Sequence, residues 1–132
     1  MIKTVAVDTN ALLDFRLKRE PGFKKTKQVI KSCSSEKTRM FIPSIVFPEI
    51  EWVLRSFYKQ SKELIINFLE ELLELEGLIL ENKLEMKNAL IYFKYSNIKF
   101  TDSIILSQIQ RVKPDEFLTF DEDLQKIYQE QF

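Results

Sequence analysis

The chain has 132 residues, of which 45% are hydrophobic, and its 20 basic and 20 acidic side chains give a formal net charge of zero. This length and composition fit one globular domain over residues 1–132 and exclude a largely disordered chain. The absence of histidine excludes histidine-based catalytic triads and zinc sites, and the single cysteine, Cys33, excludes an internal disulfide.

Short apolar segments alternate with helical patterns along the chain. In order, the sequence predicts a strand at 3–7, helices at 10–18 and 23–33, and a strand at 40–42. A helix then follows Pro43 and runs to about residue 58, and another spans 61–76. A strand at 78–80, helices at 82–96 and 102–112, a strand at 116–120 and a helix at 122–130 complete the chain. A turn at 20–22 separates the first two helices, and Gly77 is typical of a residue that ends a helix. Strands that alternate with helices indicate an α/β fold with a parallel sheet.

The charged side chains are distributed unevenly. Residues 1–60 carry twelve Lys and Arg against six Asp and Glu, whereas residues 61–132 carry eight against fourteen. A basic half suits a polyanionic partner, although solvated helix faces explain it as well. No apolar run is long enough to span a membrane and the N-terminus lacks a signal-peptide cleavage pattern, so we expect a cytoplasmic protein.

Four acidic residues stand where predicted strands end or predicted helices begin. Asp8 directly follows the first strand and Asp121 the last, while Asp102 and Glu49 lie near helix starts. In open α/β sheets, sites form at the carboxyl ends of the strands, so these side chains are candidates for one site. For an aspartate taken alone, capping its helix is the more common role.

Asp102 heads an apolar stripe in the helix predicted at 102–112. The stripe has the spacing of a buried helix face and consists of Ile105, Leu106, Ile109 and Val112. With Thr101 as the helix cap, Asp102 would point inward, where an acid needs a partner or a cation.

Two acids share the third predicted helix. Glu49 falls between two apolar zones, so we expect it in a partly apolar environment. Glu51 falls on the polar side, four residues before Arg55, and this spacing predicts a surface ion pair. Trp52 lies away from the main apolar face and indicates a second packing surface, against either the helix at 61–76 or another subunit.

Clustered carboxylates repel one another, and a divalent cation would remove that cost. Ligation by oxygen alone, without His or Cys, favours Mg²⁺ or Mn²⁺ over zinc. Catalysis near neutral pH would then depend on carboxylates, lysines, tyrosines or the bound metal.

Four segments carry a resemblance to a known family. They are Val7-Asp8-Thr9-Asn10, Ile45-Val46-Phe47-Pro48-Glu49-Ile50-Glu51-Trp52-Val53-Leu54, Phe100-Thr101-Asp102-Ser103-Ile104-Ile105 and Leu118-Thr119-Phe120-Asp121. In this order and approximate spacing, the sequence resembles PIN-domain nucleases, and most closely the VapC-like toxins of type II toxin–antitoxin pairs. The resemblance covers nearly the whole chain.

The resemblance implies a three-layer α/β/α fold with a short-stranded, mainly parallel sheet, bound Mg²⁺ or Mn²⁺, and endoribonuclease activity. It also implies a homodimer that is blocked by a cognate antitoxin protein. Matched by position, the catalytic and metal-binding acids are Asp8, Glu49, Asp102 and Asp121, with Thr9, Asn10 and Thr119 as supporting polar groups. Asp123 competes with Asp121 for the fourth position or assists it. Family members often finish with a further short strand, whereas the printed sequence ends at Gln131-Phe132.

The implied reaction is hydrolysis of RNA to 5′-phosphate and 3′-hydroxyl ends. The candidate phosphate contacts are Arg16, Lys18, Arg19, Lys24, Lys25 and Lys27, for which simple solvation is an equally good explanation. The alternatives are an RNA-processing or DNA nuclease outside toxin–antitoxin systems and a catalytically silent PIN-like binding module. A phosphohydrolase with a phospho-aspartate intermediate would need a second aspartate where Asn10 stands.

Overall fold

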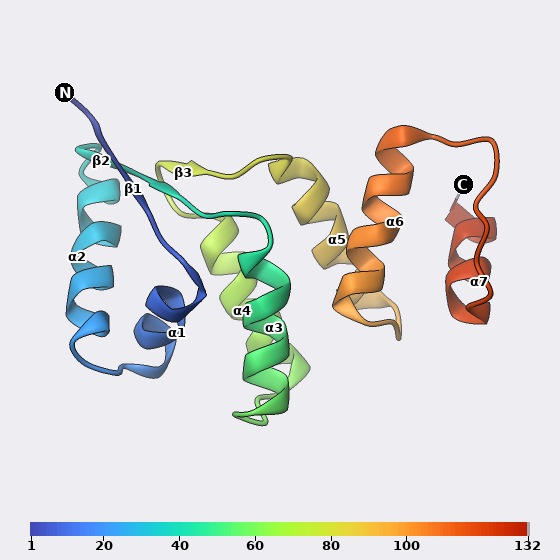
Figure 1. The fold of residues 1–132 in the computed structure, drawn as a ribbon, viewed down its shortest axis with the longest axis horizontal. Coiled ribbons are helices and arrows are strands. Elements are labelled where there is room, and N and C mark those ends of the chain that lie inside the picture. Colours follow the sequence, from blue (N-terminus) through green and yellow to red (C-terminus); the bar gives the residue numbers. More distant parts are fainter. Residues whose placement is uncertain (132) are drawn as a thin grey trace. The chain divides into compact units, whose positions relative to one another are not determined.

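A computed structural model gives the structure of residues 1–131. The chain divides into two compact units, Met1–Glu81 and Asn82–Phe132 (Figure 1). That both units form one domain over residues 1–132 stays a prediction. Among residues 1–131, no helix is both long and apolar enough to cross a membrane.

The first unit is built on a parallel sheet. Its strands are β1 (Lys3–Ala6), β2 (Thr38–Phe41) and β3 (Leu78–Ile79), in the order β1-β2-β3. The central strand is the most buried, because Met40 and the following Ile42 are fully enclosed. The α/β class and the parallel sheet predicted from the sequence are therefore confirmed.

Four helices complete the first unit. They are α1 (Thr9–Leu17), α2 (Gly22–Ser34), α3 (Val46–Ser56) and α4 (Lys62–Leu73). Each begins within one or two residues of the start predicted from the sequence. Helix α1 packs against α2 and α3, α2 packs against β2, and α3 packs against α4. Leu12, Phe47 and Phe68 are among the largest side chains enclosed by this packing.

Gly77 has a different role from the predicted one. Helix α4 ends at Leu73 with Glu74 as its cap residue, so Gly77 lies beyond the helix end. Its φ of +73° lies in the left-handed region, and a Cβ atom there would lie 2.9 Å from the backbone oxygen of Thr38. Its own carbonyl accepts a hydrogen bond of 2.9 Å from the Met40 backbone. Glycine is therefore needed for the close approach of the chain to β2 and not to end α4.

The second unit is helical, with α5 (Lys83–Tyr95), α6 (Phe100–Val112) and α7 (Glu122–Gln131). Helices α5 and α6 pack along each other, and the rings of Phe93 and Phe100 meet with centroids 5.2 Å apart.

The strand predicted at 116–120 is absent, because residues 114–121 contain neither helix nor strand. The alternating pattern there is typical of a strand, but a strand needs a hydrogen-bonded neighbour, and the described part of this unit, 82–131, contains no other strand. Leu118 and Phe120 are accordingly exposed. Helix α7 extends to Gln131, so a further strand like the one that often ends members of the resembled family would have to begin at Phe132. Phe132 lies outside the described residues.

Helix α6 begins two residues earlier than predicted, which changes its buried face. Lys99 occupies the cap position, so Thr101 is inside the helix and is not its cap. The buried residues are Phe100, Ser103, Leu106 and Ser107, while Ile105 and Val112 of the predicted stripe are exposed. Burial of the Phe100 ring fixes this face, because residues three and seven positions later lie on the same side of a helix. Asp102 is half-buried at its edge.

Replacing Gly77 with alanine should lower the free energy of unfolding by about 1–3 kcal/mol, because the left-handed backbone and the contact with Thr38 both penalise a Cβ atom. Urea unfolding followed by circular dichroism measures this change. The exposed neighbour Glu76 provides the control, since Glu76→Ala should be close to neutral. Equal stability of the two variants would show that position 77 tolerates a side chain.

Candidate active site

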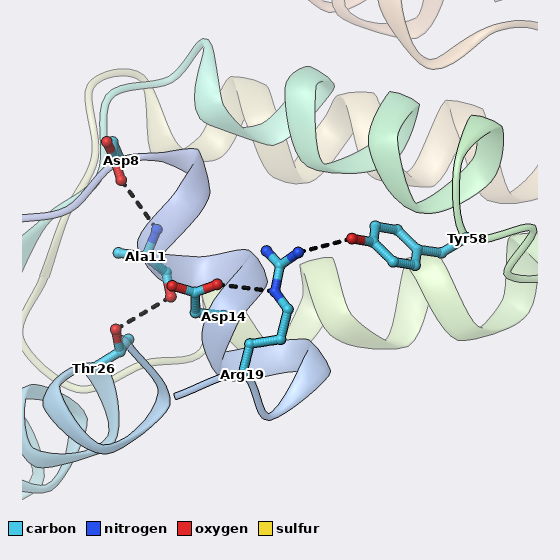
Figure 2. A network of polar contacts seen from close by, with 6 residues as sticks. All are labelled: Asp8, Ala11, Asp14, Arg19, Thr26 and Tyr58. Atoms are coloured by element: carbon cyan, nitrogen blue, oxygen red, sulfur yellow. Dashed lines mark hydrogen bonds and ion pairs between the residues drawn. The ribbon is translucent and has the colours of Figure 1, made fainter. Parts of the chain in front are cut away.

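Asp8 is fixed at the point where β1 leads into α1. Val7 continues the sheet pairing through a hydrogen bond of 3.0 Å from its N–H to the Phe41 carbonyl. Asp8 is then the N-cap of α1, and its Oδ1 accepts a hydrogen bond of 3.0 Å from the Ala11 backbone (Figure 2). In the described structure its other carboxylate oxygen has no hydrogen-bond partner, and the residue is exposed. One oxygen therefore holds the helix start while the other faces outward.

Glu49 lies at the same end of the sheet, because β2 runs parallel to β1 and leads into α3. The Thr9 hydroxyl donates a hydrogen bond of 2.8 Å to Oε1 of Glu49. Since Thr9 directly follows Asp8, this bond holds the two acidic residues near each other although they are far apart in sequence. Glu49 is exposed, so the partly apolar environment predicted for it is wrong.

Glu51 and Arg55 form the predicted ion pair, with Nε of Arg55 2.6 Å from the Glu51 carboxylate. The predicted surface position of Glu51 is wrong, since its side chain is only 5% exposed whereas that of Arg55 is 54% exposed. The guanidinium provides the partner that a buried carboxylate needs. The hydrogen bond to Glu51 raises the pKa of Arg55 above its ordinary value, so this arginine stays charged.

Asp121 occupies the same position before α7 as Asp8 does before α1. Its Oδ1 accepts a hydrogen bond of 3.0 Å from the Leu124 backbone, and its own N–H donates to the Thr119 hydroxyl at 3.1 Å. Gln125 donates to the Thr119 carbonyl at 2.8 Å, which further fixes this turn. Asp123 is exposed in the first turn of α7.

The four predicted acids are divided equally between the two units. Asp8 and Glu49 belong to the first unit, and Asp102 and Asp121 to the second. Among residues 1–131, no three acidic or thiol side chains gather in a group able to hold a metal ion. A site made of all four acids therefore stays a prediction.

The chain matches the family described as PIN domain over residues 5–130. It belongs to the PIN domain family. A search of curated proteins found no match to this chain. Proteins with this domain are generally nucleases that use divalent metal ions, so we describe the chain as a PIN-domain nuclease.

The predicted phosphate contacts of this PIN domain fall into two groups. Arg16 is half-buried and lies over the Phe68 ring, 5.4 Å from its centroid. Arg19 is held by Asp14 at 2.9 Å and donates to the Tyr58 hydroxyl at 2.8 Å (Figure 2). The lysines of the set are exposed and are Lys18, Lys24, Lys25 and Lys27, of which Lys27 lies over the Phe23 ring, 5.6 Å from its centroid. Lys18, Lys24 and Lys25 are therefore better placed than the two arginines to meet a polyanion.

Asp14 holds Arg19 beyond the far end of α1 (Figure 2). A Cβ atom at position 22 would collide with the Asp14 carboxylate, so Gly22 leaves room for this ion pair. Together with the Tyr58 hydrogen bond, the pair ties the end of α1 to the segment after α3. Helices α1 and α3 are thus joined near both ends, by Thr9 and by Arg19.

Replacing Thr9 with valine should lower nuclease activity while keeping the shape of the side chain. Hydrogen bonds to charged groups contribute about 1.5–3 kcal/mol, and this one is partly exposed, so we expect a loss of about tenfold in rate. Initial rates on single-stranded RNA measure the effect, with thermal unfolding as the check on folding. Thr9→Ser keeps the hydroxyl and is the control. An active Thr9→Val variant would show that Glu49 does not need this hydrogen bond.

Proposed function

We propose that this PIN-domain protein is a divalent-metal-dependent endoribonuclease of the VapC-like type and acts as the toxin of a toxin–antitoxin pair. The observation that carries the proposal is the linked pair of Asp8 and Glu49. Asp8 caps α1, and the next residue, Thr9, donates a hydrogen bond of 2.8 Å to Glu49 of α3. Both acidic residues are exposed. Two accessible carboxylates held at the same end of the sheet are suited to a cation and to a phosphodiester beside it.

The donor chemistry fits Mg²⁺ or Mn²⁺. Asp8 uses one carboxylate oxygen for capping and Glu49 uses one for the Thr9 hydroxyl, so each retains a further oxygen as a ligand. These hard oxygen donors are the type that Mg²⁺ and Mn²⁺ prefer. When bound, the metal would supply charge neutralisation and a more acidic water.

Asp102 and Asp121 are proposed to complete the site. The resemblance to PIN-domain nucleases supports this proposal, and Asp121 caps α7 through Oδ1 as Asp8 caps α1. Asn10 and Thr119 would act as supporting polar groups, and Thr119 already orients the Asp121 backbone. Asp123 would assist from the first turn of α7.

The reaction that follows from these groups is hydrolysis at phosphorus. A carboxylate of the site would accept a proton from the attacking water. Lys18, directly after α1, and the exposed lysines of α2 would contact neighbouring phosphates. The products would carry 5′-phosphate and 3′-hydroxyl ends. A 2′,3′-cyclic phosphate product detected by mass spectrometry would contradict this chemistry.

The decisive variant is Asp8→Asn, because asparagine caps a helix about as well as aspartate and removes the charge. We expect cleavage of total RNA in Mg²⁺ or Mn²⁺ to fall at least a hundredfold, as chelation of the metal should also cause. Asp8→Ala loses the bond to Ala11 as well, and should be less stable by about 1 kcal/mol. Asp115→Asn, at an exposed aspartate outside the candidate site, is the control with the same change of charge. Full cleavage by a folded Asp8→Asn protein would disprove the assignment.

Metal binding can be tested without cleavage. We expect Mn²⁺ to raise the melting temperature of the wild-type protein, because a ligand that binds only the folded state stabilises it. Asp8→Asn and Glu49→Gln should each abolish this rise, whereas Glu63→Gln, at an exposed position of α4, should keep it. The absence of any rise in the wild-type protein would favour a silent binding module. Parallel assays on DNA distinguish an RNase from a DNase.

We also propose that the protein is a homodimer and that a small antitoxin protein inhibits it. Light scattering coupled to size exclusion measures the first claim, with a mass of twice 15.7 kDa expected. Genomic context gives the cheapest test of the second, because a small adjacent gene should encode the antitoxin. A monomeric mass at micromolar concentration would contradict the homodimer.

A further inference from the structure

We propose that Trp52 forms a stacking subsite for an unpaired base of the nucleic acid substrate, beside Glu49. The inference rests on the proposed nuclease function and names a contact that the acidic site does not supply. It predicts that the enzyme binds single-stranded substrate next to the bond that it cuts.

The position of Trp52 relative to Glu49 is the first argument. Both residues lie on α3, three positions apart, and residues at this spacing are neighbours on one side of a helix, about 5–6 Å apart at Cβ. Glu49 is exposed and Trp52 is 51% exposed, so the same face of α3 presents both side chains to solvent. If a metal ion at Glu49 holds a phosphate of the substrate, the base of that nucleotide or of the next one would lie within reach of the indole ring.

The second argument is that another aromatic ring packs against the indole ring of Trp52. Phe57 meets it edge to face, with centroids 5.4 Å apart and an interplanar angle of 79°. Edge-to-face contacts hold an aromatic ring in a defined orientation, and the exposed remainder of the indole stays available. Aromatic rings presented in this way stack with any base, because every base has a π face.

Arg55 places a donor for a phosphate oxygen next to Trp52. Arg55 follows Trp52 by three residues on α3, and its guanidinium is oriented by hydrogen bonds from Nε and Nη2 to the buried Glu51 carboxylate. Its Nη1 takes part in neither bond, and the side chain is 54% exposed, so a donor remains for a phosphate oxygen. Glu49, Trp52 and Arg55 follow one another at intervals of three residues on α3. This order of acid, aromatic ring and guanidinium matches the order of metal-bound phosphate, base and phosphate in a bound strand.

Trp52 is the single tryptophan of the chain, so intrinsic fluorescence reports on this residue alone. The experiment uses the full chain carrying Asp8→Asn, which should not cut, and a fluorescein-labelled single-stranded RNA whose anisotropy measures binding independently. We expect quenching of Trp52 emission that follows the anisotropy curve. Trp52→Ala should weaken binding about tenfold, Trp52→Phe should weaken it less, and the control Leu64→Ala, an exposed apolar residue of α4, should leave it unchanged.

The outcomes separate the two proposals. RNA that binds without quenching, together with unchanged affinity of Trp52→Ala, overturns the stacking subsite and leaves the nuclease function standing. Failure of the oligonucleotide to bind, with no RNA cleavage by the wild-type protein, overturns the nuclease function itself. A blue shift of Trp52 emission that depends on protein concentration, without RNA, would assign this face to a second copy of the chain and would also overturn the subsite.

Discussion

The hydrogen bond between Thr9 and Glu49 is the interaction on which the candidate site depends. Strands β1 and β2 are parallel and in register, so the helices that follow them begin at the same end of the sheet. The bond of 2.8 Å then joins the first residue of α1 to the first turn of α3. At the other end of α1, Arg19 joins Asp14 to Tyr58, so the relation between these two helices is fixed at two points.

Capping a helix and binding a metal are compatible roles for an aspartate. Asp8 and Asp121 both accept one backbone hydrogen bond at the start of a helix, through Oδ1 in each residue. A carboxylate has two oxygens and several lone pairs, so a cap uses only part of its capacity and also fixes its direction. The sequence suggests a choice between the two roles, whereas the geometry allows both together. The capping bond is thus a way to hold a ligand rigidly.

Partners inside the protein also decide which basic residues can meet a substrate. Arg16 lies over Phe68, and Arg19 is bonded to Asp14 and Tyr58, whereas Lys24 and Lys25 project from α2 into solvent. Arginine is well suited to such internal bonds because its planar group donates in several directions. The same property explains why Arg55 can satisfy the buried Glu51 and still present a donor to solvent.

The sequence by itself determined the alternation of strands and helices, the positions of Asp8 and Asp121 at helix starts, and the Glu51–Arg55 pair, because periodicity and local spacing are properties of neighbouring residues. It did not determine that Glu51 is buried, that α6 buries the face of Phe100, or that Gly77 approaches Thr38, since these depend on what packs against each element. The segment 116–120 has the pattern of a strand and is not one, because strand pairing needs a partner that local sequence cannot supply. Only the tertiary structure decided these points.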